Sequence, residues 1–232
     1  MRMQCVMVAV VAGFYMPVVL QAEEQHKITG QVIDADGKPV VGADVATSWS
    51  ADAGKMHPFN GVQTDKDGKF SLPVEGAFGN AVMVLDKERK TGRLEIFKGK
   101  SLTLNFQLEP VVKVHGSVFC KELNKVPPWT TVSVYIRQPG IHARLVQWSP
   151  NEKGFVFFLP PGTYQLAAEG SGVESLNKEL TLSAEMPDVD LKVLNLEAEV
   201  ITRLIGKAPP PWNVTAARGV SKDAKLSDFK GK

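Results

Sequence analysis

Strict alternation of apolar and polar residues is the clearest pattern in this chain. Residues 102–108 alternate without a slip, residues 131–136 repeat the pattern, and residues 155–159 and 164–168 follow it less cleanly. A period of two places every second side chain on one face, so each segment is predicted to be a strand with one buried face. Between residues 27 and 196 we find no stretch with the period of an amphipathic helix.

Turn-forming residues separate these segments. Two Asp-Gly pairs and several further Gly or Pro turns occur, at Asp36-Gly37, Asp67-Gly68, Gly76, Gly79-Asn80, Pro139-Gly140 and Pro161-Gly162. Short strands at such spacing are typical of antiparallel sandwiches. The predicted fold is all-β, with two tandem antiparallel Greek-key β-sandwiches and an irregular C-terminal tail.

An internal repeat supports two sandwiches. Each copy begins with a similar strand, later has a similar turn and strand, and closes on an alternating strand; the matched segments are 28–32 with 114–118, 67–73 with 153–160, and 102–108 with 189–196. The predicted units are therefore residues 23–109 and 110–197, joined at Pro110, with residues 198–232 as a tail. Gly30 is expected to let another backbone or a large side chain approach the first strand.

Two short acidic motifs, Asp34-Ala-Asp-Gly37 and Asp65-Lys-Asp-Gly68, look like fragments of a calcium loop. A calcium-binding loop of the helix–loop–helix type needs a third acidic ligand, a distal Glu and flanking helices, and these motifs lack them. Both are predicted to be turns whose aspartates accept local backbone N–H bonds.

The first 22 residues have the pattern of a secretory signal. A basic Arg2 precedes the apolar run of residues 6–20, and small or apolar residues follow before a cleavage position at Ala22. Cleavage would leave no membrane span and a periplasmic or cell-surface protein; the alternative is an uncleaved N-terminal anchor. Loss of Arg2 would leave 26 basic against 25 acidic residues, a net charge of about +1. No basic stripe is present, so a nucleic-acid partner is not expected.

Candidate chemistry is sparse. Cys120 is the only cysteine after the signal, so neither a Cys-x-x-Cys pair nor an intramolecular disulfide can form there, and the four histidines fall singly. We predict no catalytic residue, no cofactor and no metal ligand. Trp129, Trp148 and Tyr135, together with Trp49, could form a stacking platform for a ligand; the alternative is that these rings pack in the core or at its rim. Trp129 is the least core-like, because Pro127-Pro128 places it in a rigid loop.

The first repeat resembles the carboxypeptidase regulatory-like (transthyretin-like) sandwich. The resemblance rests on residues 30–34, 37–45 and 64–70, and in the second repeat more loosely on residues 159–166. It implies a fold and almost nothing about activity. Residues 126–130 depart from the pattern of that family.

The end of the chain resembles the entry into a redoxin (thioredoxin-like) domain, on Ile205-Gly-Lys-Ala-Pro209 and Leu226-Ser-Asp-Phe-Lys-Gly-Lys232. The resemblance implies a thiol-disulfide oxidoreductase whose Cys-x-x-Cys motif would follow Lys232. The chain is therefore expected to be the non-catalytic accessory or binding part of such an exported enzyme, with an unknown protein or glycan partner in the cell envelope. The alternative is a free-standing surface module that binds carbohydrate or peptide, with a chance proline-rich tail.

Overall fold

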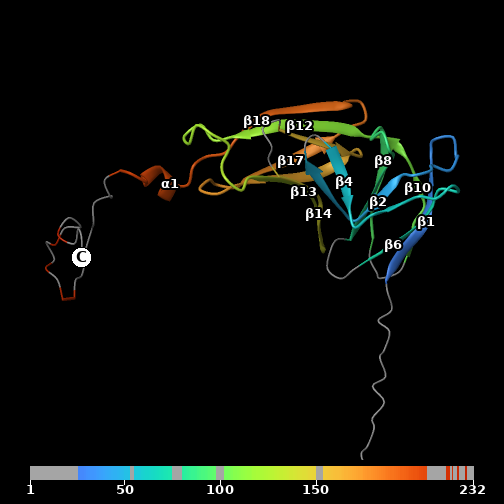
Figure 1. Ribbon diagram of the computed structural model, residues 1–232, viewed down its shortest axis with the longest axis horizontal. Helices are drawn as coiled ribbons and strands as arrows, with labels where there is room; N and C mark the ends of the chain where they lie inside the picture. The colour runs from blue at the N-terminus through green and yellow to red at the C-terminus, as the bar shows by residue number, and fades with distance from the viewer. Residues whose placement is uncertain are drawn as a thin grey trace, which may run out of the picture.

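Strands make up nearly all of the computed structural model (Figure 1). It describes residues 26–52, 55–74, 80–97, 102–149 and 154–207, with 218, 219, 221, 224 and 228. Among these, α1 (Val200–Leu204) is the one helix. The all-β prediction is confirmed. The predicted signal and most of the redoxin-like segment lie outside the described residues.

The first repeat forms two facing sheets. In one, β1 lies between β6 on one side and β9 and β10 on the other; in the second the order is β11-β8-β7-β2-β5. The strands are β1 (Lys27–Ile33), β2 (Asp44–Ala46), β5 (Val62–Gln63), β6 (Lys69–Pro73), β7 (Ala81–Leu85), β8 (Thr91–Ile96), β9 (Leu102–Thr103), β10 (Phe106–Gln107) and β11 (Glu109–Pro110).

The second repeat also forms two sheets, in the orders β15-β12-β18 and β17-β16-β13-β14. The strands are β12 (Val112–Phe119), β13 (Thr131–Gln138), β14 (Ile141–Trp148), β15 (Phe155–Leu159), β16 (Gly162–Glu169), β17 (Leu176–Leu182) and β18 (Asp188–Asn195). The larger sheet continues past β14 with β3 (Ser48–Asp52) and β4 (Lys55–Phe59), which belong to the first repeat in sequence.

The opening strands of the two repeats, β1 and β12, occupy equivalent places in their sheets. Each pairs antiparallel with one neighbour, β6 or β15, and parallel with a segment near the end of its own repeat, β9 and β10 or β18. In each, a glycine faces an interruption of that segment: a Cβ on Gly30 would lie 1.7 Å from the carbonyl oxygen of Leu104, and one on Gly116 would lie 2.9 Å from that of Lys192. Close backbone approach therefore explains both glycines.

These parallel pairs correct one detail of the sequence prediction. Residues 102–108 were expected to form one continuous strand, but the structure has two short strands, β9 and β10, separated by Leu104 and Asn105. Leu104 N–H donates to the carbonyl oxygen of Thr29, so the backbone bends around Gly30 while remaining bonded to β1. The alternation persists across the break because Phe106 and Leu108 still point into the core.

Both Asp-containing motifs are turns, as predicted. The Asp34 carboxylate accepts the backbone N–H groups of Asp36 and Lys38, each at 2.9 Å. Asp65 accepts those of Asp67 and Lys69 in the same way, at 2.9 and 2.8 Å. One oxygen of each carboxylate thus closes its own turn.

The β3–β4 hairpin joins the two repeats. β3 pairs in parallel with β14, matching Trp49 to Val146 and Ala51 to Trp148. Trp49, Ala51 and Met56 are at most 3% exposed and pack in the hydrophobic cluster of the second repeat. The first repeat therefore supplies part of the second core.

Strand β7 also takes part in the contact between the two repeats, because its side chains pack in both hydrophobic clusters. Every residue of β7 is buried: Val82 and Val84 face the core of the first repeat, whereas Ala81, Met83 and Leu85 belong to the cluster of the second. The β13–β14 hairpin contributes Ile136, Ile141 and Ala143 to that same cluster. Figure 1 shows the two repeats lying side by side.

A partly buried ion pair stabilises the contact between β2 and the β3–β4 hairpin. Arg89 Nη2 lies 2.6 Å from Asp44 Oδ2, and these side chains are 15% and 10% exposed. Arg89 also donates to the carbonyl oxygen of Met56 at 3.1 Å and lies 5.2 Å above the Trp49 ring. One side chain thus ties β2 to both strands of the β3–β4 hairpin.

Candidate binding surfaces

The structure separates the three aromatic residues proposed as a ligand platform. Trp148 is 1% exposed and packs edge-on against Phe155, so its ring takes part in the core. Tyr135 lies on the outer face of β13, stacked on His142 with 5.3 Å between ring centroids. Trp129 is 89% exposed. Trp49, the fourth candidate, is buried, so only Trp129 and Tyr135 remain available to a ligand.

Trp129 is held in an unusual backbone conformation. Its φ is +55°, a left-handed value that side chains with a Cβ seldom adopt and that costs about 1–3 kcal/mol. The loop is fixed on both sides of the ring: Thr130 Oγ1 donates to the carbonyl oxygen of Pro127 at 2.7 Å, and Ser171 N–H donates to that of Pro128 at 2.8 Å. The fold therefore holds a large apolar ring out in solvent.

Helix α1 lies beside this loop, across the turn at Gly172. Glu199 N–H donates to the carbonyl oxygen of Gly172, and Arg203 lies 3.5 Å from Glu122 and 3.6 Å from Glu197. The helix buries none of its residues and has no side-chain cap. A five-residue helix gains little stability alone in water, and most helices are held by packing of an apolar face. Here that face is uncovered.

Five exposed apolar side chains gather at this end of the second sandwich. They are Val126, Trp129, Val200, Ile201 and Ile205, exposed by 42% to 89%. Four other large apolar side chains among the described residues are comparably exposed, and one of them, Val193, lines the same hollow as Val126. We call these five the end surface. Large apolar side chains exposed together on a neighbouring loop and helix are typical of an interaction site.

A second feature is a charged cluster on the outer face of β12 and β18. His115 Nε2 lies 2.7 Å from Asp188 Oδ1 and its Nδ1 lies 3.8 Å from Asp190, while Lys113 and Lys192 reach the same two carboxylates at 3.1 and 2.7 Å. Both ring nitrogens of His115 therefore face carboxylates. Although Ser117 follows on the same strand, no free imidazole nitrogen remains to take its proton, so the cluster lacks the geometry of a nucleophilic triad.

The charges of this cluster compensate one another. Hydrogen bonding from Lys113, with a further contribution from His115, holds the pKa of Asp188 below its ordinary value. Hydrogen bonding from Lys192 lowers the pKa of Asp190 in the same way, and Asp190 in turn raises the pKa of Lys192. The cluster thus acts as an ion-pair network across the parallel β12–β18 pair.

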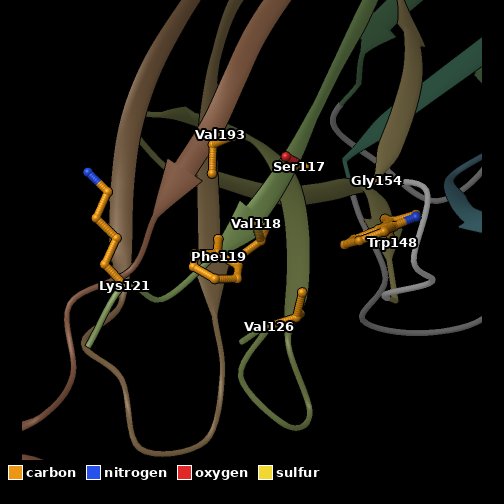
Figure 2. A pocket seen from close by; sticks show the side chains of 8 residues that line it. All are labelled: Ser117, Val118, Phe119, Lys121, Val126, Trp148, Gly154 and Val193. Atoms are coloured by element: carbon orange, nitrogen blue, oxygen red, sulfur yellow. The ribbon is translucent and has the colours of Figure 1, made fainter. Parts of the chain in front are cut away.

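A hollow of about 590 Å³ opens beside the last residues of β12 (Figure 2). Val118, Val126 and Trp148 supply much of its apolar wall, and Lys121 points away from them. The indole N–H of Trp148 has no hydrogen-bond partner among the described residues. Convergent polar groups, which orient a small ligand in most binding pockets, are not found in its lining.

The single thiol of the described ranges and the groups that could bind a metal ion were the remaining candidates for chemistry. Cys120 is buried, and its thiol donates weakly to Glu122 Oε2 at 3.5 Å. No group of three His, Cys, Asp or Glu side chains within the described residues could hold a metal ion. The same part of the chain has no helix that is long and apolar enough to cross a membrane.

Comparison with known proteins gives structural neighbours only. No family model and no curated protein matches the sequence, so neither resemblance noted above has support from that side. Similar solved structures include the Bacillus anthracis TIE protein (13% identity, TM-score 0.32, 75% of this chain and 34% of that one) and a streptococcal ancillary pilin (14%, 0.33, 76% and 63%). Another is GBS52, a minor pilin of Streptococcus agalactiae (12%, 0.30, 83% and 100%). The chain spans about a third of the length of the first of these proteins and just under two thirds of the second. TM-scores this low are not a basis for transferring a function.

Proposed function

We propose that this chain is an exported, non-catalytic β-sandwich module that binds a partner protein through the end surface. The observation that carries the proposal is Trp129, an 89% exposed ring held at positive φ beside an uncovered apolar helix. Trp is the residue most enriched at the energetic centres of protein interfaces. The partner is expected to present an apolar patch.

The surroundings of the ring favour a protein over a sugar. Carbohydrate sites combine an aromatic face with hydrogen-bonding side chains, whereas the neighbours of Trp129 in the end surface are aliphatic. Glu174 and Glu199 border this surface and make no ion pair within the described residues. A partner with lysines or arginines around its apolar patch would complement that rim.

Export and lack of catalysis complete the proposal. The signal-like pattern of residues 1–22 supports export. The closed ion-pair network at His115 and the buried single thiol of Cys120 support a binding role. A redoxin parent would be compatible with this role, but that idea rests only on the sequence after Leu204.

Site-specific photocrosslinking tests the proposal. A photoreactive phenylalanine analogue at position 129, in the full chain expressed in its native host, should form an adduct with one discrete envelope protein. The same analogue at Phe59, which is 61% exposed at a distant edge, serves as the control. With the purified partner, Trp129→Ser should weaken binding by about tenfold or more.

Two outcomes would contradict the proposal. One is an adduct pattern at position 129 that matches the pattern at Phe59. The other is unchanged affinity of Trp129→Ser for the purified partner. The Trp129→Ser chain should keep its unfolding midpoint, because the ring is exposed and makes no core contact. A chain that instead bound neutral glycans through Trp129 would favour the carbohydrate alternative.

A further inference from the structure

The outer face of the β13–β14 hairpin carries an unbalanced positive charge. Arg137, His142 and Arg144 point outward on neighbouring positions, because Arg137 pairs with His142 and Tyr135 pairs with Arg144 across the two strands. Cross-strand partners share a face of the sheet. The opposite face of the hairpin is buried in the core. The three basic side chains therefore share one solvent-facing surface.

Neither arginine has a carboxylate partner among the described residues. Arg144 makes no ion pair there, and Arg137 makes only a cation–π contact, 5.7 Å above the Tyr135 ring. The other arginines of the core strands and joint, Arg89 and Arg93, are each bound to a carboxylate. No Asp or Glu occurs between residues 122 and 152, so the hairpin cannot neutralise itself.

The nearest acid in the same cross-strand row is too distant to compensate. That row runs Arg144, Tyr135, Gln165 and Glu179 through the consecutive strands β14, β13, β16 and β17. Strand spacing of about 4.8 Å puts Glu179 roughly 14 Å from Arg144, beyond the Debye length of about 8 Å at physiological salt. Gln165 also contacts Glu179, at 3.4 Å.

The part of this face next to the hairpin also carries polar side chains. Gln147 and Ser50 lie on it, by the pairing of β14 with β3, whereas Ser133 beside Gln147 is only 5% exposed. Amide and hydroxyl groups of this kind bond sugar hydroxyls, and arginine forks bind carboxylate or sulfate oxygens bidentately. Within the β13–β14 part of the face Tyr135 is the only large apolar side chain among the described residues, and the exposed Phe59 lies two strands away on β4. An apolar protein interface therefore has little to bury around the arginines.

We propose that this face binds an acidic polysaccharide, with Arg137 and Arg144 on its anionic groups, His142 beside them, and the edge of Tyr135 against a sugar ring. The site is independent of the end surface in both residues and ligand chemistry. Its anionic groups could be carboxylates of uronic acids or sulfate esters, which share the same recognition chemistry.

Binding of the full chain to three polysaccharides tests the proposal: polygalacturonate, dextran sulfate and neutral dextran, measured by affinity electrophoresis at low and physiological salt. One or both acidic polymers should retard the protein, and neutral dextran should not. Arg137→Gln/Arg144→Gln should weaken binding by about tenfold or more. Its matched control, Lys66→Gln/Lys207→Gln, removes the same charge from exposed residues elsewhere and should change binding by less than about twofold.

The unfolding midpoint of both double variants should equal that of the parent chain, since none of the four side chains is buried. Equal weakening by both double variants would show unspecific attraction and overturn the proposal. The proposal would also be overturned if neither acidic polysaccharide bound at low salt. The same holds if polyglutamate bound more tightly than both acidic polysaccharides. A polymer preference would distinguish carboxylate from sulfate recognition.

Discussion

Neither repeat should fold stably when it is separated from the other. A chain of residues 23–109 would expose the side chains that this half gives to the shared cluster, of which Trp49, Met56, Met83 and Leu85 are the large ones, each at most 3% exposed. At about 1.5–3 kcal/mol for each large side chain, this burial is worth roughly 6–12 kcal/mol. Compactness of the unfolded chain reduces the figure to about 4–10 kcal/mol. A domain of this size has about 5–15 kcal/mol of stability in total, so little or none remains.

Urea unfolding followed by near-ultraviolet circular dichroism and by tryptophan fluorescence provides the assay. Residues 23–199 should unfold in one transition that is the same by both probes. Residues 23–109 and 110–199 alone should lack cooperative transitions, and mixing them should restore part of the near-ultraviolet signal. A cooperative transition of residues 23–109 alone, with more than about 3 kcal/mol of stability, would refute the reasoning. The repeats would then be the independent units that the sequence boundary predicts.

Further predictions concern single positions. Gly30→Ala should lower the free energy of unfolding in the same urea assay by about 3 kcal/mol, because its Cβ would lie 1.7 Å from a carbonyl oxygen; a variant as stable as the parent would refute this. Arg89→Ala should cost about 3 kcal/mol, since it leaves a carboxylate that is only 10% exposed without its cation; an unchanged midpoint would contradict this. The pKa values of Asp188 and Asp190 are lowered in the folded chain. The stabilisation that these two carboxylates give is therefore present above their unfolded pKa values and is lost as the pH falls through their folded pKa values. Below about pH 4 the unfolding midpoint of the parent chain should fall more steeply than the midpoint of the double variant Asp188→Asn/Asp190→Asn. Ending the chain at residue 199 should change the melting temperature by only a few degrees, because α1 buries nothing.

Local features were predictable because each depends on nearby residues. The alternation located most core strands, and the Asp34 and Asp65 turns close on their own backbone. The repeat correctly paired Gly30 with Gly116, since the same close approach of the last strand recurs in both copies. Tyr164, in a segment matched to the sandwich family, is buried and donates to the carbonyl oxygen of Pro160 at 2.7 Å.

Features that depend on distant contacts were not predictable. Trp49 and Met56 lie in a segment without clear alternation, and nothing local shows that their core belongs to the other repeat. The exposure of Trp129 was anticipated from Pro127 and Pro128, but the exposed helix beside it was not. Arg137 and Arg144 were not predicted as a binding site, although the sequence around them contains no Asp or Glu.

The reciprocal hairpins also have a mechanical consequence. Tandem modules joined only by a linker bend freely, and the directions in which their surfaces point are averaged. Here β3 is bonded to β14 while β7 is packed between both cores, so bending at Pro110 would require breaking a sheet. The pair should respond to force as one stiff body, and its end surface and the face of the β13–β14 hairpin keep a fixed angle to one another. Two ligands bound to these two surfaces would be held at a fixed separation and orientation.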